Sequence, residues 1–560
     1  MDDYHIENLP DEKCVIFVVA TSGQGELPTN MRANWRKLLN RNLPLNLLEN
    51  VAIAVFGLGD SSYAKYNFAG KKLYRRLIQL GARTILNLGL GDDQHELGID
   101  GGFEPWRKEL WERIFEDRFF EEMRLDFSKE ELLPPRYKLE WIDENGNLHK
   151  NRQNFVENGQ SVDCVSDYLP VKVLENERVT ALDHFQDTRL INFSTREYEN
   201  LQNNPLRYEP GDVLMVYPYN LSETVDLAQE ALGYSDELLN RPFRLGSNDS
   251  NLPLPPKWIV KEITTLRICL ERLFDLQMIP RRSLFELLSK ISENDLEKER
   301  LKELASAQGL DDYLDYCQRP RRTVAEMLRD FPNTAKNIPP ERLFDIFSTI
   351  RARAFSIASS PRAHIGKIQL LIAKVEYKVK RMASKRLGLC SNFIARLMTG
   401  DQVFVKIRSG TFRRTPADPL LMIGPGTGVA PFRSMISDLY CFAQKPPCIL
   451  FFGCRNSKKD FYFEKEWPNL ENLKLFTAFS RDDSEKKIYV QHKMRENANA
   501  VWNFLQLPNS RILLAGSANQ MPKDVMDCLK NIAAENGIGD VDAFIENLER
   551  TGRLQFETWS

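Results

Sequence analysis

The sequence predicts an α/β protein of several domains, in which antiparallel strands separate two units built on parallel strands. Three observations support this fold class. Apolar segments followed by polar, glycine-containing loops recur within residues 1–116. Strand-rich segments at 168–219 and 353–412 enclose a helical stretch at about 221–350. A glycine-rich turn at 423–432 follows an apolar strand and opens a helix. We expect domains at 1–116, 168–415 and 416–560, with a linker at 117–167.

The composition limits the class of protein. Hydrophobic residues make up 42% and charged residues 28% of the 560, as in ordinary globular proteins. The net charge of −2 gives no basic field for nucleic acid. No apolar run reaches the roughly 18 residues of a membrane span, and the acidic start MDDYHIENLPDEK is unlike a signal peptide. The nine cysteines form no C-x-x-C pair or Cys/His cluster, which argues against a metal. These features predict a soluble, cytoplasmic protein without a metal site.

The first domain is predicted from three units of strand and loop. The strands and the loops that follow them are 14–20 and 21–30, 51–56 and 57–67, and 84–88 and 89–97, with a helix at 70–80. Ligands bind at the carboxyl ends of strands in such sheets, and Tyr63 and Tyr66 favour a flat aromatic ligand. The alternative is that the loops are only tight turns between strands and helices.

The middle of the chain changes character twice. Residues 117–167 lose periodicity and gain turn formers, which predicts a linker with one short hairpin, either a functional tether or a plain surface loop. Residues 168–219 then read as strands of an antiparallel barrel. The helical block at about 221–350 interrupts this barrel, which resumes from Arg353 and ends near Phe412.

Three motifs in the second half fit two diphosphates. Arg353 in RAFSIASS and Arg321 supply cationic charge, and the GLCS turn that begins at Gly388 allows close backbone approach. The turn IGPGTGVAPF, Ile423–Phe432, places the positive end of a helix next to a strand end. Each motif alone is weak, and their order along the chain makes them specific.

A cationic, hydroxyl-rich cluster follows in FTAFSRDDSEKKIYVQ, where Ser480 and Arg481 precede Lys487. A nucleotide 2′-phosphate requires such a cluster, whereas an NAD site would favour an acidic residue on the ribose. The alternative is a solvated surface, because the charges in DDSEKK alternate in sign.

Together these motifs resemble the diflavin reductase family over nearly the whole chain. RAFS, GLCS, the glycine turn and the terminal FETWS match its ferredoxin–NADP⁺ reductase module, and the loops of the first domain match its FMN domain. The resemblance implies a flavodoxin-like domain, an antiparallel FAD-binding β-barrel with a helical insertion, and a Rossmann-like NADP-binding domain.

The resemblance assigns cofactor contacts residue by residue. For FMN they are Thr21, Ser22, Gly23 and Gln24 on one side, Leu58, Gly59, Asp60, Ser61, Ser62, Tyr63, Ala64, Lys65, Tyr66 and Asn67 on the other, and Asp93 at the rim. For FAD they are Arg321, Arg353, Ala354, Phe355, Ser356, Gly388, Leu389, Cys390, Ser391 and Trp559. For NADPH they are Thr427, Ser480, Arg481, Lys487, Ile488, Tyr489, Val490, Gln491 and Asp524.

The resemblance also implies catalytic roles for Ser356, Glu557 and Trp559. Trp559 would stack on FAD and move aside for the nicotinamide, while Ser356 and Glu557 orient hydride transfer. The sequence departs from the family in small ways: Ser22 replaces a second stacking tyrosine of the P450 reductases, and Phe355 replaces a tyrosine. Glu557 stands for an aspartate and Ala515 for a cysteine.

A larger departure concerns the start of the flavodoxin-like domain. The family begins with a strand and a loop that wraps the FMN phosphate, and nothing of that kind precedes Cys14. The loss of several charge-assisted hydrogen bonds, about 1.5–3 kcal/mol each, predicts weak or absent FMN binding. We also expect one side of a hydrophobic strand to be exposed.

Within the family the sequence is similar to the soluble NADPH-dependent diflavin oxidoreductases of cytosolic iron–sulfur protein assembly. That resemblance implies electron transfer from NADPH through FAD and FMN to the protein anamorsin. Acidic residues at the rim would guide the docking of anamorsin: Asp60, Asp92, Asp93 and Glu96. The alternative is that these four are ordinary solvated loop charges. Two alternatives remain: an FAD-only NADPH reductase with impaired FMN binding, and a non-catalytic competitor of a full-length enzyme.

Overall fold

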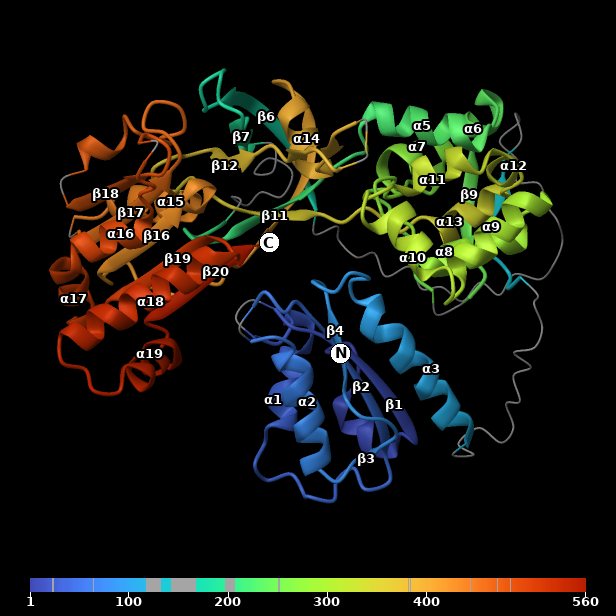
Figure 1. The fold of residues 1–560 in the computed structure, drawn as a ribbon, viewed down its shortest axis with the longest axis horizontal. Helices are drawn as coiled ribbons and strands as arrows, with labels where there is room; N and C mark the ends of the chain where they lie inside the picture. Colours follow the sequence, from blue (N-terminus) through green and yellow to red (C-terminus); the bar gives the residue numbers. More distant parts are fainter. Residues whose placement is uncertain are drawn as a thin grey trace. The chain divides into compact units, whose positions relative to one another are not determined.

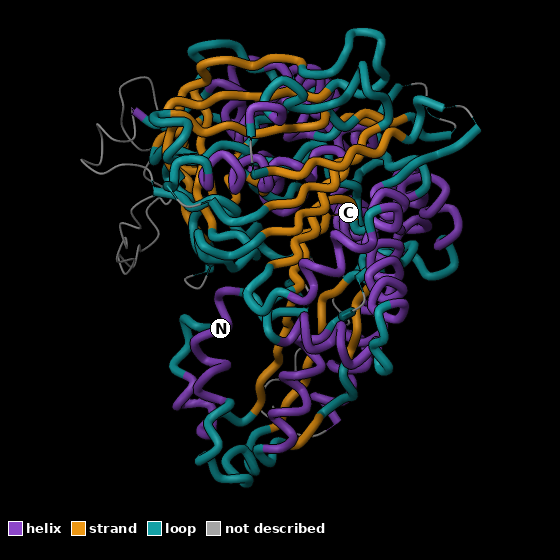
Figure 2. The backbone as a smooth tube through the Cα atoms, turned by 90° about the vertical axis from the view of Figure 1, so that its left-hand side faces the viewer, coloured by secondary structure: helices purple, strands orange, loops and turns teal. Residues whose placement is uncertain are grey.

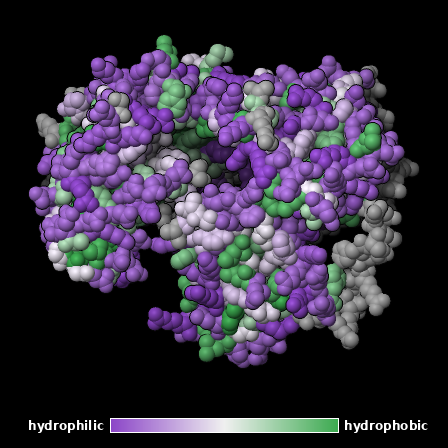
Figure 3. Space-filling view, viewed as in Figure 1, coloured by the Kyte–Doolittle hydropathy of each residue, from purple (hydrophilic) through white to green (hydrophobic). Residues whose placement is uncertain are grey.

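The computed structural model describes residues 1–22, 25–63, 65–116, 132–142, 168–196, 207–249, 252–380, 382, 384–443, 445–470, 472–483 and 485–559. Contacts divide the chain into two units (Figure 1). The first is Met1–Glu130 with Ser517–Met521 and Thr558–Ser560, and the second is Glu131–Gly516 with Pro522–Glu557. On the face shown in Figure 3, hydrophilic side chains predominate and hydrophobic ones form small patches. Among the described helices, none combines the length and apolarity needed to cross a membrane.

The first unit contains a parallel sheet whose strands follow the predicted ones closely. Strand β1 (Cys14–Ala20) pairs with β2 (Ala52–Gly59), which also pairs with β3 (Arg83–Thr84) and β4 (Gly89–Asp92). The prediction of one third strand at 84–88 is wrong. Thr84 lies opposite Ile53, and Gly89 lies opposite Phe56. The segment from Thr84 to Gly89 is therefore longer than the segment of β2 that it faces, and the extra residues interrupt the strand.

Helices cover both faces of this sheet, as Figure 1 shows. Helices α1 (Arg32–Leu38) and α2 (Phe68–Gln79) pack against one face, where Ile53 and Val55 are buried. Helix α3 (Asp100–Glu116) packs against Ala54 and Phe56 on the other face. A short 3₁₀ helix, η1 (Ile6–Asp11), precedes β1. This three-layer order, with helices on both faces of a parallel sheet, is the one that the implied flavodoxin-like domain requires.

Strand β1 forms the edge of the described sheet, because β2 is its only partner there. Ile16 and Val18 lie opposite Ala54 and Phe56, and therefore on the face covered by α3. Their side chains are nevertheless 41% and 54% exposed. The expected exposed side of a hydrophobic strand is found at these two residues.

The second unit contains a six-stranded antiparallel sheet, in the order β11-β8-β15-β6-β7-β12. An antiparallel bridge between Ile357, just after β11, and Leu370 in β12 joins the two end strands, as closure of the sheet into a barrel requires. The strands are β6 (Leu169–Arg178), β7 (Thr188–Ser194), β8 (Val213–Tyr217), β11 (Arg353–Ser356), β12 (Lys367–Ala373) and β15 (Gln402–Arg408).

The insert between β8 and β11 is largely helical, and its helices gather in one block (Figures 1 and 2). They are α5 (Ser222–Leu232), α6 (Asp236–Asn240), α7 (Leu266–Arg272), α8 (Arg282–Ile291), α9 (Asp295–Ala305), α10 (Leu310–Tyr313), α11 (Val324–Asp330), α12 (Pro332–Lys336) and α13 (Leu343–Ile346). The insert also holds strands, which the sequence did not predict: β9 (Phe243–Ser247) pairs with β10 (Ile263–Thr264).

The described part of the predicted linker joins this same small sheet. Strand β5 (Tyr137–Trp141) pairs with β9, with Tyr137 opposite Ser247. The prediction of a local hairpin is therefore wrong for these residues, because the partner strand lies in the insert. The remainder of the predicted linker, 117–131 and 143–167, lies outside the described residues.

A five-stranded sheet in the order β18-β17-β16-β19-β20 is formed by the C-terminal part of the chain. Its strands are β16 (Leu420–Pro425), β17 (Cys448–Cys454), β18 (Leu473–Phe479), β19 (Arg511–Ser517) and β20 (Leu554–Trp559). The helices are α15 (Ala430–Leu439), α16 (Val490–Glu496), α17 (Ala498–Gln506), α18 (Gln520–Glu535) and α19 (Val541–Arg550). Strand order reverses between β16 and β19, which is where a doubly wound sheet binds its ligand.

Candidate active site

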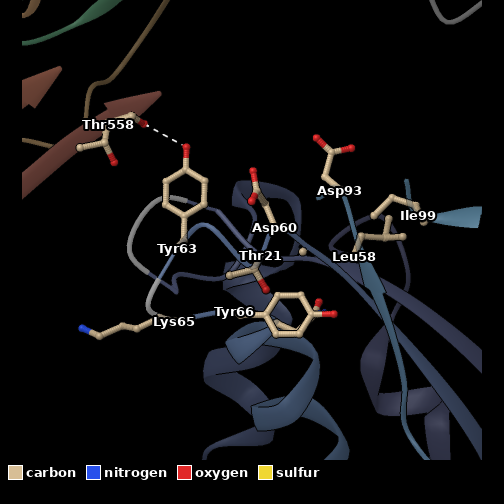
Figure 4. A pocket seen from close by; sticks show the side chains of 11 residues that line it. Thr21, Leu58, Asp60, Tyr63, Lys65, Tyr66, Asp93, Ile99 and Thr558 are labelled. Carbon is tan, nitrogen blue, oxygen red and sulfur yellow. Dashed lines mark hydrogen bonds between the residues drawn. The ribbon is translucent and has the colours of Figure 1, made fainter. Parts of the chain in front are cut away.

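A cavity of about 310 Å³ lies at the carboxyl ends of β2 and β4 in the first unit (Figure 4). Figure 4 shows the rings of Tyr63 and Tyr66 along one side of it, and Asp93 and Ile99 along the other. Nine of the predicted FMN residues line it: Thr21, Leu58, Gly59, Asp60, Tyr63, Lys65, Tyr66, Asn67 and Asp93. Ile99 and Thr558, which were not predicted, complete the lining.

Hydrogen bonds between loops give this cavity its shape. Asn67 is fully buried in a left-handed conformation with φ 56°, and its amide donates to the Gly91 carbonyl at 2.9 Å. The Tyr66 hydroxyl donates to the same carbonyl at 3.1 Å, and the Tyr63 hydroxyl donates to Thr558 at 3.4 Å. The second and third loops are thus held together at the point where the strands end.

Asp92 stabilises the second loop from the third. Its Oδ1 accepts the Ser61 N–H at 2.8 Å and the Gln94 N–H at 3.1 Å. Burial acts to raise the pKa of Asp92, but the hydrogen bonds from Ser61 and Gln94 outweigh burial and lower the pKa overall. The carboxylate is therefore the form that holds the loop.

Some predicted FMN residues do not line this cavity. Ser22 forms an isolated antiparallel bridge with Glu26. The backbone N–H groups of Ser61 and Ser62 bond to Asp92 and Asp60, so these serines shape the loop. Gly23, Gln24 and Ala64 lie outside the described residues. The aromatic lining fits the ring of FMN, and Lys65 is the one cationic side chain among the residues that line the cavity.

A second cavity, of about 400 Å³, lies in the second unit. Arg321, Arg353, Gly388 and Leu389, all predicted for FAD, line it together. Gly388 precedes helix α14 (Leu389–Arg396) as its N-cap residue without a side-chain cap, which leaves the first-turn N–H groups for a ligand. A Cβ on Gly388 would come within 2.8 Å of Val375 Cβ, so the close approach requires glycine. These features fit a diphosphate.

An ion pair that the sequence did not predict also lines this cavity. Arg386 Nη1 lies 2.7 and 2.9 Å from the two carboxylate oxygens of Glu326, and each residue is only 9% exposed. Burial acts to raise the pKa of Glu326, but hydrogen bonds from Arg386 and Thr323 lower it overall. The sequence did carry a signal, because Thr323 and Glu326 form a T-x-x-E capping box.

The remaining predicted FAD residues stabilise the elements around this cavity. Ala354 and Phe355 pair with Met215 and Leu214 of β8. Ser391 Oγ accepts the Val375 N–H at 3.0 Å. Burial raises the pKa of the Cys390 thiol to about 12, so this cysteine packs rather than reacts.

The predicted catalytic pair is in direct contact. Ser356 Oγ donates to Glu557 Oε1 at 2.6 Å, and Thr411 Oγ1 donates to Oε2 of the same carboxylate at 3.1 Å. Burial raises the pKa of Glu557, against the lowering effect of these two hydroxyls. Trp559 ends β20 with an exposed side chain.

The predicted nucleotide residues lie at strand ends of the C-terminal sheet. Thr427 belongs to the turn η5 (Gly426–Val429) between β16 and α15. A Cβ on Gly428 would meet the Ala515 carbonyl oxygen at 2.2 Å, so this turn packs directly against the end of β19. Such backbone contact leaves the N–H groups of the turn close to the switch point.

The cationic cluster begins where β18 ends. The N–H groups of Ser480 and Arg481 donate to Cys454 and Arg455 at the end of β17, which leaves the Arg481 side chain exposed. Lys487, Ile488 and Tyr489 lead into α16, which contains Val490 and Gln491. Gln491 donates to Asp524 in α18 at 3.1 Å, so these two predicted residues are brought together.

Comparison with known proteins identifies three families of domain in this chain. Residues 1–106 match a flavodoxin model, 164–393 an FAD-binding domain model and 422–527 an oxidoreductase NAD-binding domain model. The chain is 42% identical to NADPH-dependent diflavin oxidoreductase 1 of Xenopus laevis, over 100% of this chain and 94% of that protein. It is 36% identical to the protein of the same name from Schizosaccharomyces pombe, over 100% of this chain and 93% of that protein.

The chain belongs to the NADPH-dependent diflavin oxidoreductase 1 family. It is accordingly an NADPH oxidoreductase, with domains for FMN, FAD and the nicotinamide nucleotide. This confirms the predicted family and the predicted fold class. The flavodoxin match begins at the first residue.

Several residues of these sites were missed because their partners are distant in sequence. Thr411 contacts Glu557, which lies 146 residues away. Ile99 lines the first cavity from the turn before α3, and Tyr377 lines the second from the short strand β13 (Glu376–Tyr377). No local motif marks these three residues.

Proposed function

We propose that the chain transfers electrons from NADPH, by way of FAD and then FMN, to an anamorsin-type iron–sulfur protein in the cytoplasm. The observation that supports this route is the presence of two different flavin-compatible cavities in one chain. One is lined by Tyr63 and Tyr66 at parallel strand ends, and the other by Arg321 and Arg353 in the second unit. Flavins supply the chemistry, since they accept hydride and release single electrons.

The protein supplies binding, orientation and charge. Arg321 and Arg353, with the first turn of α14, would hold the diphosphate of FAD. Ser356 holds its proton toward Glu557, which fixes the direction of its hydroxyl. Trp559, at the end of β20, would cover the flavin until the nicotinamide enters. Arg481 and Lys487 would bind the 2′-phosphate.

An acidic rim would guide the protein acceptor. Asp60 and Asp93 line the first cavity, Asp92 ends β4, and Glu96 lies in the loop that follows. Carboxylates there would speed association with a basic surface, an effect that salt screens. Raising the ionic strength should therefore slow reduction of the protein acceptor much more than reduction of ferricyanide.

The first experiment is the flavin content of the gently purified chain. We expect close to one FMN and one FAD per mole after release with acid, together with NADPH-dependent reduction of the iron–sulfur protein. FAD alone, with ferricyanide reduced and cytochrome c not, would support the FAD-only reductase instead. The exposed edge at β1 is the observation that keeps this alternative open. Absence of FAD and of NADPH oxidation would support the non-catalytic competitor.

Nucleotide preference is tested by Arg481→Ala. Loss of a charge-assisted contact of about 1.5–3 kcal/mol should raise KM for NADPH about 10- to 100-fold and leave NADH unchanged. Arg550→Ala, an exposed arginine of α19, is the matched control and should change neither value. A parallel loss with both nucleotides would contradict a 2′-phosphate contact. Trp559→Ala should loosen the discrimination between NADPH and NADH.

A further inference from the structure

The Glu557 carboxylate is held by hydroxyls from two different segments. Ser356 ends β11 and donates to Oε1 at 2.6 Å. Thr411 follows β15 and donates to Oε2 at 3.1 Å. Each carboxylate oxygen thus has its own hydroxyl donor, and the Thr411 N–H is a further donor to the carboxylate. Together these donors restrict the rotation of the carboxylate about its last bond. Nothing in the sequence motifs pointed to Thr411.

We propose that Thr411 is a positioning residue, which holds the Glu557 carboxylate so that Oε1 accepts the hydrogen bond from the Ser356 hydroxyl. This inference rests on the proposed function, because Ser356 and Glu557 are the residues placed beside the reacting flavin. A serine hydroxyl that donates to a carboxylate presents its lone pairs on its other side. Thr411 therefore acts on Ser356 through Glu557. It sets whether the lone pairs of the Ser356 hydroxyl face away from Glu557 and can accept a hydrogen bond there.

Anchoring of the C-terminal strand is a separate role, which other contacts already fulfil. Gln555 Nε2 donates to the Arg413 carbonyl at 2.7 Å and to the Gly552 carbonyl at 2.7 Å. Thr411 also lies 3.4 Å from the Phe556 carbonyl, a longer contact than its bond to Glu557. Removal of the Thr411 hydroxyl should therefore loosen the carboxylate, which keeps the Ser356 hydroxyl and the Thr411 N–H as donors, without freeing the strand.

The electrostatic surroundings of Glu557 are consistent with this role. Burial raises the pKa of the carboxyl, whereas Ser356, Thr411 and the charge of Arg408 at the end of β15 lower it. Loss of the Thr411 donor removes one of the lowering contributions. The pKa of Glu557 should consequently move further upward, and the protonated form, which no longer accepts from both hydroxyls, should persist to higher pH.

The test compares Thr411→Val, Thr411→Ser and Gln555→Ala in the full chain. In Thr411→Val we expect hydride uptake from NADPH at neutral pH to slow about 2- to 10-fold, the value of one hydrogen bond. The acidic limb of its pH profile and the pH dependence of the FAD midpoint potential should both move to higher pH. Thr411→Ser should restore the wild-type values, and Gln555→Ala should leave both pH profiles in place.

An infrared titration of the Glu557 carboxyl, assigned with Glu557→Gln, provides a reading that does not depend on turnover. It should show the carboxyl titrating at higher pH in Thr411→Val whether or not the preparation retains flavin. An unshifted titration in Thr411→Val, or an equal shift in Gln555→Ala, would overturn the role of Thr411. Failure of the proposed function would appear separately, as a wild-type chain that binds no FAD.

Discussion

Strands β1 and β17 are alike in sequence and differ in environment. Each has seven residues, CVIFVVA and CILFFGC, and each belongs to a parallel sheet. Strand β17 lies between β16 and β18, and all seven of its residues are buried. Strand β1 has one described partner, and only Val19 is buried. A continuous apolar run therefore indicates a strand, whereas its neighbours decide which of its side chains leave water.

The difference affects the ligand sites at the ends of these strands. The loops after β16 and β19 are fixed by strands on both sides, and the Gly428 turn contacts the Ala515 backbone. In the first unit, the central strand β2 is buried over its first six residues and its loop is held by Asn67 and Asp92. The first loop, which follows the edge strand β1, is held by the Thr21 N–H, which donates to the Leu58 carbonyl at 3.0 Å, and by the bridge between Ser22 and Glu26. The loop at the edge strand therefore depends on hydrogen bonds, whereas the loops after β16 and β19 also have strands on both sides.

The largest expected effect comes from truncating the same residue type in both strands. Ile449 in β17 is 2% exposed and Ile16 in β1 is 41% exposed. Ile449→Ala should lower the free energy of unfolding of its domain by about 2–5 kcal/mol through lost burial and a cavity. Ile16→Ala should cost about 1 kcal/mol or less, as at other exposed positions.

Hydrogen exchange measured by mass spectrometry suits this comparison, because a chain of several domains has no single unfolding energy. Peptides covering β17 should lose protection in Ile449→Ala, while those covering β1 change little in Ile16→Ala. Equal losses in the two variants would mean that β1 is covered in solution by something other than the described residues. That result would remove the contrast between the strands.

A second comparison substitutes one glycine in a ligand loop of each unit. A Cβ on Gly428 would meet a backbone oxygen at 2.2 Å, whereas a Cβ on Gly59 would meet the Asn67 side chain at 2.7 Å. Backbone yields less readily than a side chain, so Gly428→Ala should cost about 1–3 kcal/mol in NADPH binding. Gly59→Ala should lower FMN content and leave the NADPH affinity unchanged.

Gly539→Ala is the control, because a Cβ there would have no atom within 4 Å. Equilibrium binding of NADP⁺ and acid-released flavin content measure the two effects separately. Loss of NADP⁺ binding in Gly59→Ala would show that the two loops are coupled. The comparison would then no longer describe independent sites.

The sequence predicted what depends on local pattern. The strands and the loops after them follow from patterns of neighbouring residues. Motifs of the same local kind singled out Arg321, Arg353 and Gly388, which line one cavity. Pairings between distant segments were missed, as with β5 and β9. The pair of Thr411 and Glu557 belongs to the same class, because a single threonine after a strand carries no signal of its partner.

Burial was the other quantity that the sequence did not determine. The apolar pattern alone predicts the same burial for β1 and β17. The interruption between β3 and β4 depends on their register with β2, which the pattern does not show. Gly23 and Gln24 lie outside the described residues, so their contacts with FMN stay a prediction. Strands and helices are therefore predicted well from local pattern, whereas the neighbours that bury them are not.

The smallest expected effect is a difference in sign between two carboxyl groups, one in each unit. The pKa of Asp92 is lowered in the fold, so its contribution to stability is present above its ordinary pKa and is lost as the pH falls through the folded value. The pKa of Glu557 is raised above its ordinary 4.5, so its contribution is present at low pH and is lost as the pH rises through the folded value.

Hydrogen exchange corrected for its intrinsic pH dependence should therefore show opposite trends. The loop 57–63 should lose protection below about pH 4, and Asp92→Asn should flatten that loss. The strand β20 should lose protection as the pH rises above 4.5, and Glu557→Gln should remove the dependence. Trends of the same sign in both peptides would show that the hydrogen bonds to Asp92 do not outweigh its burial. The two units would then differ in the packing of their strands, as β1 and β17 show, and not in the pH dependence of their carboxyl groups.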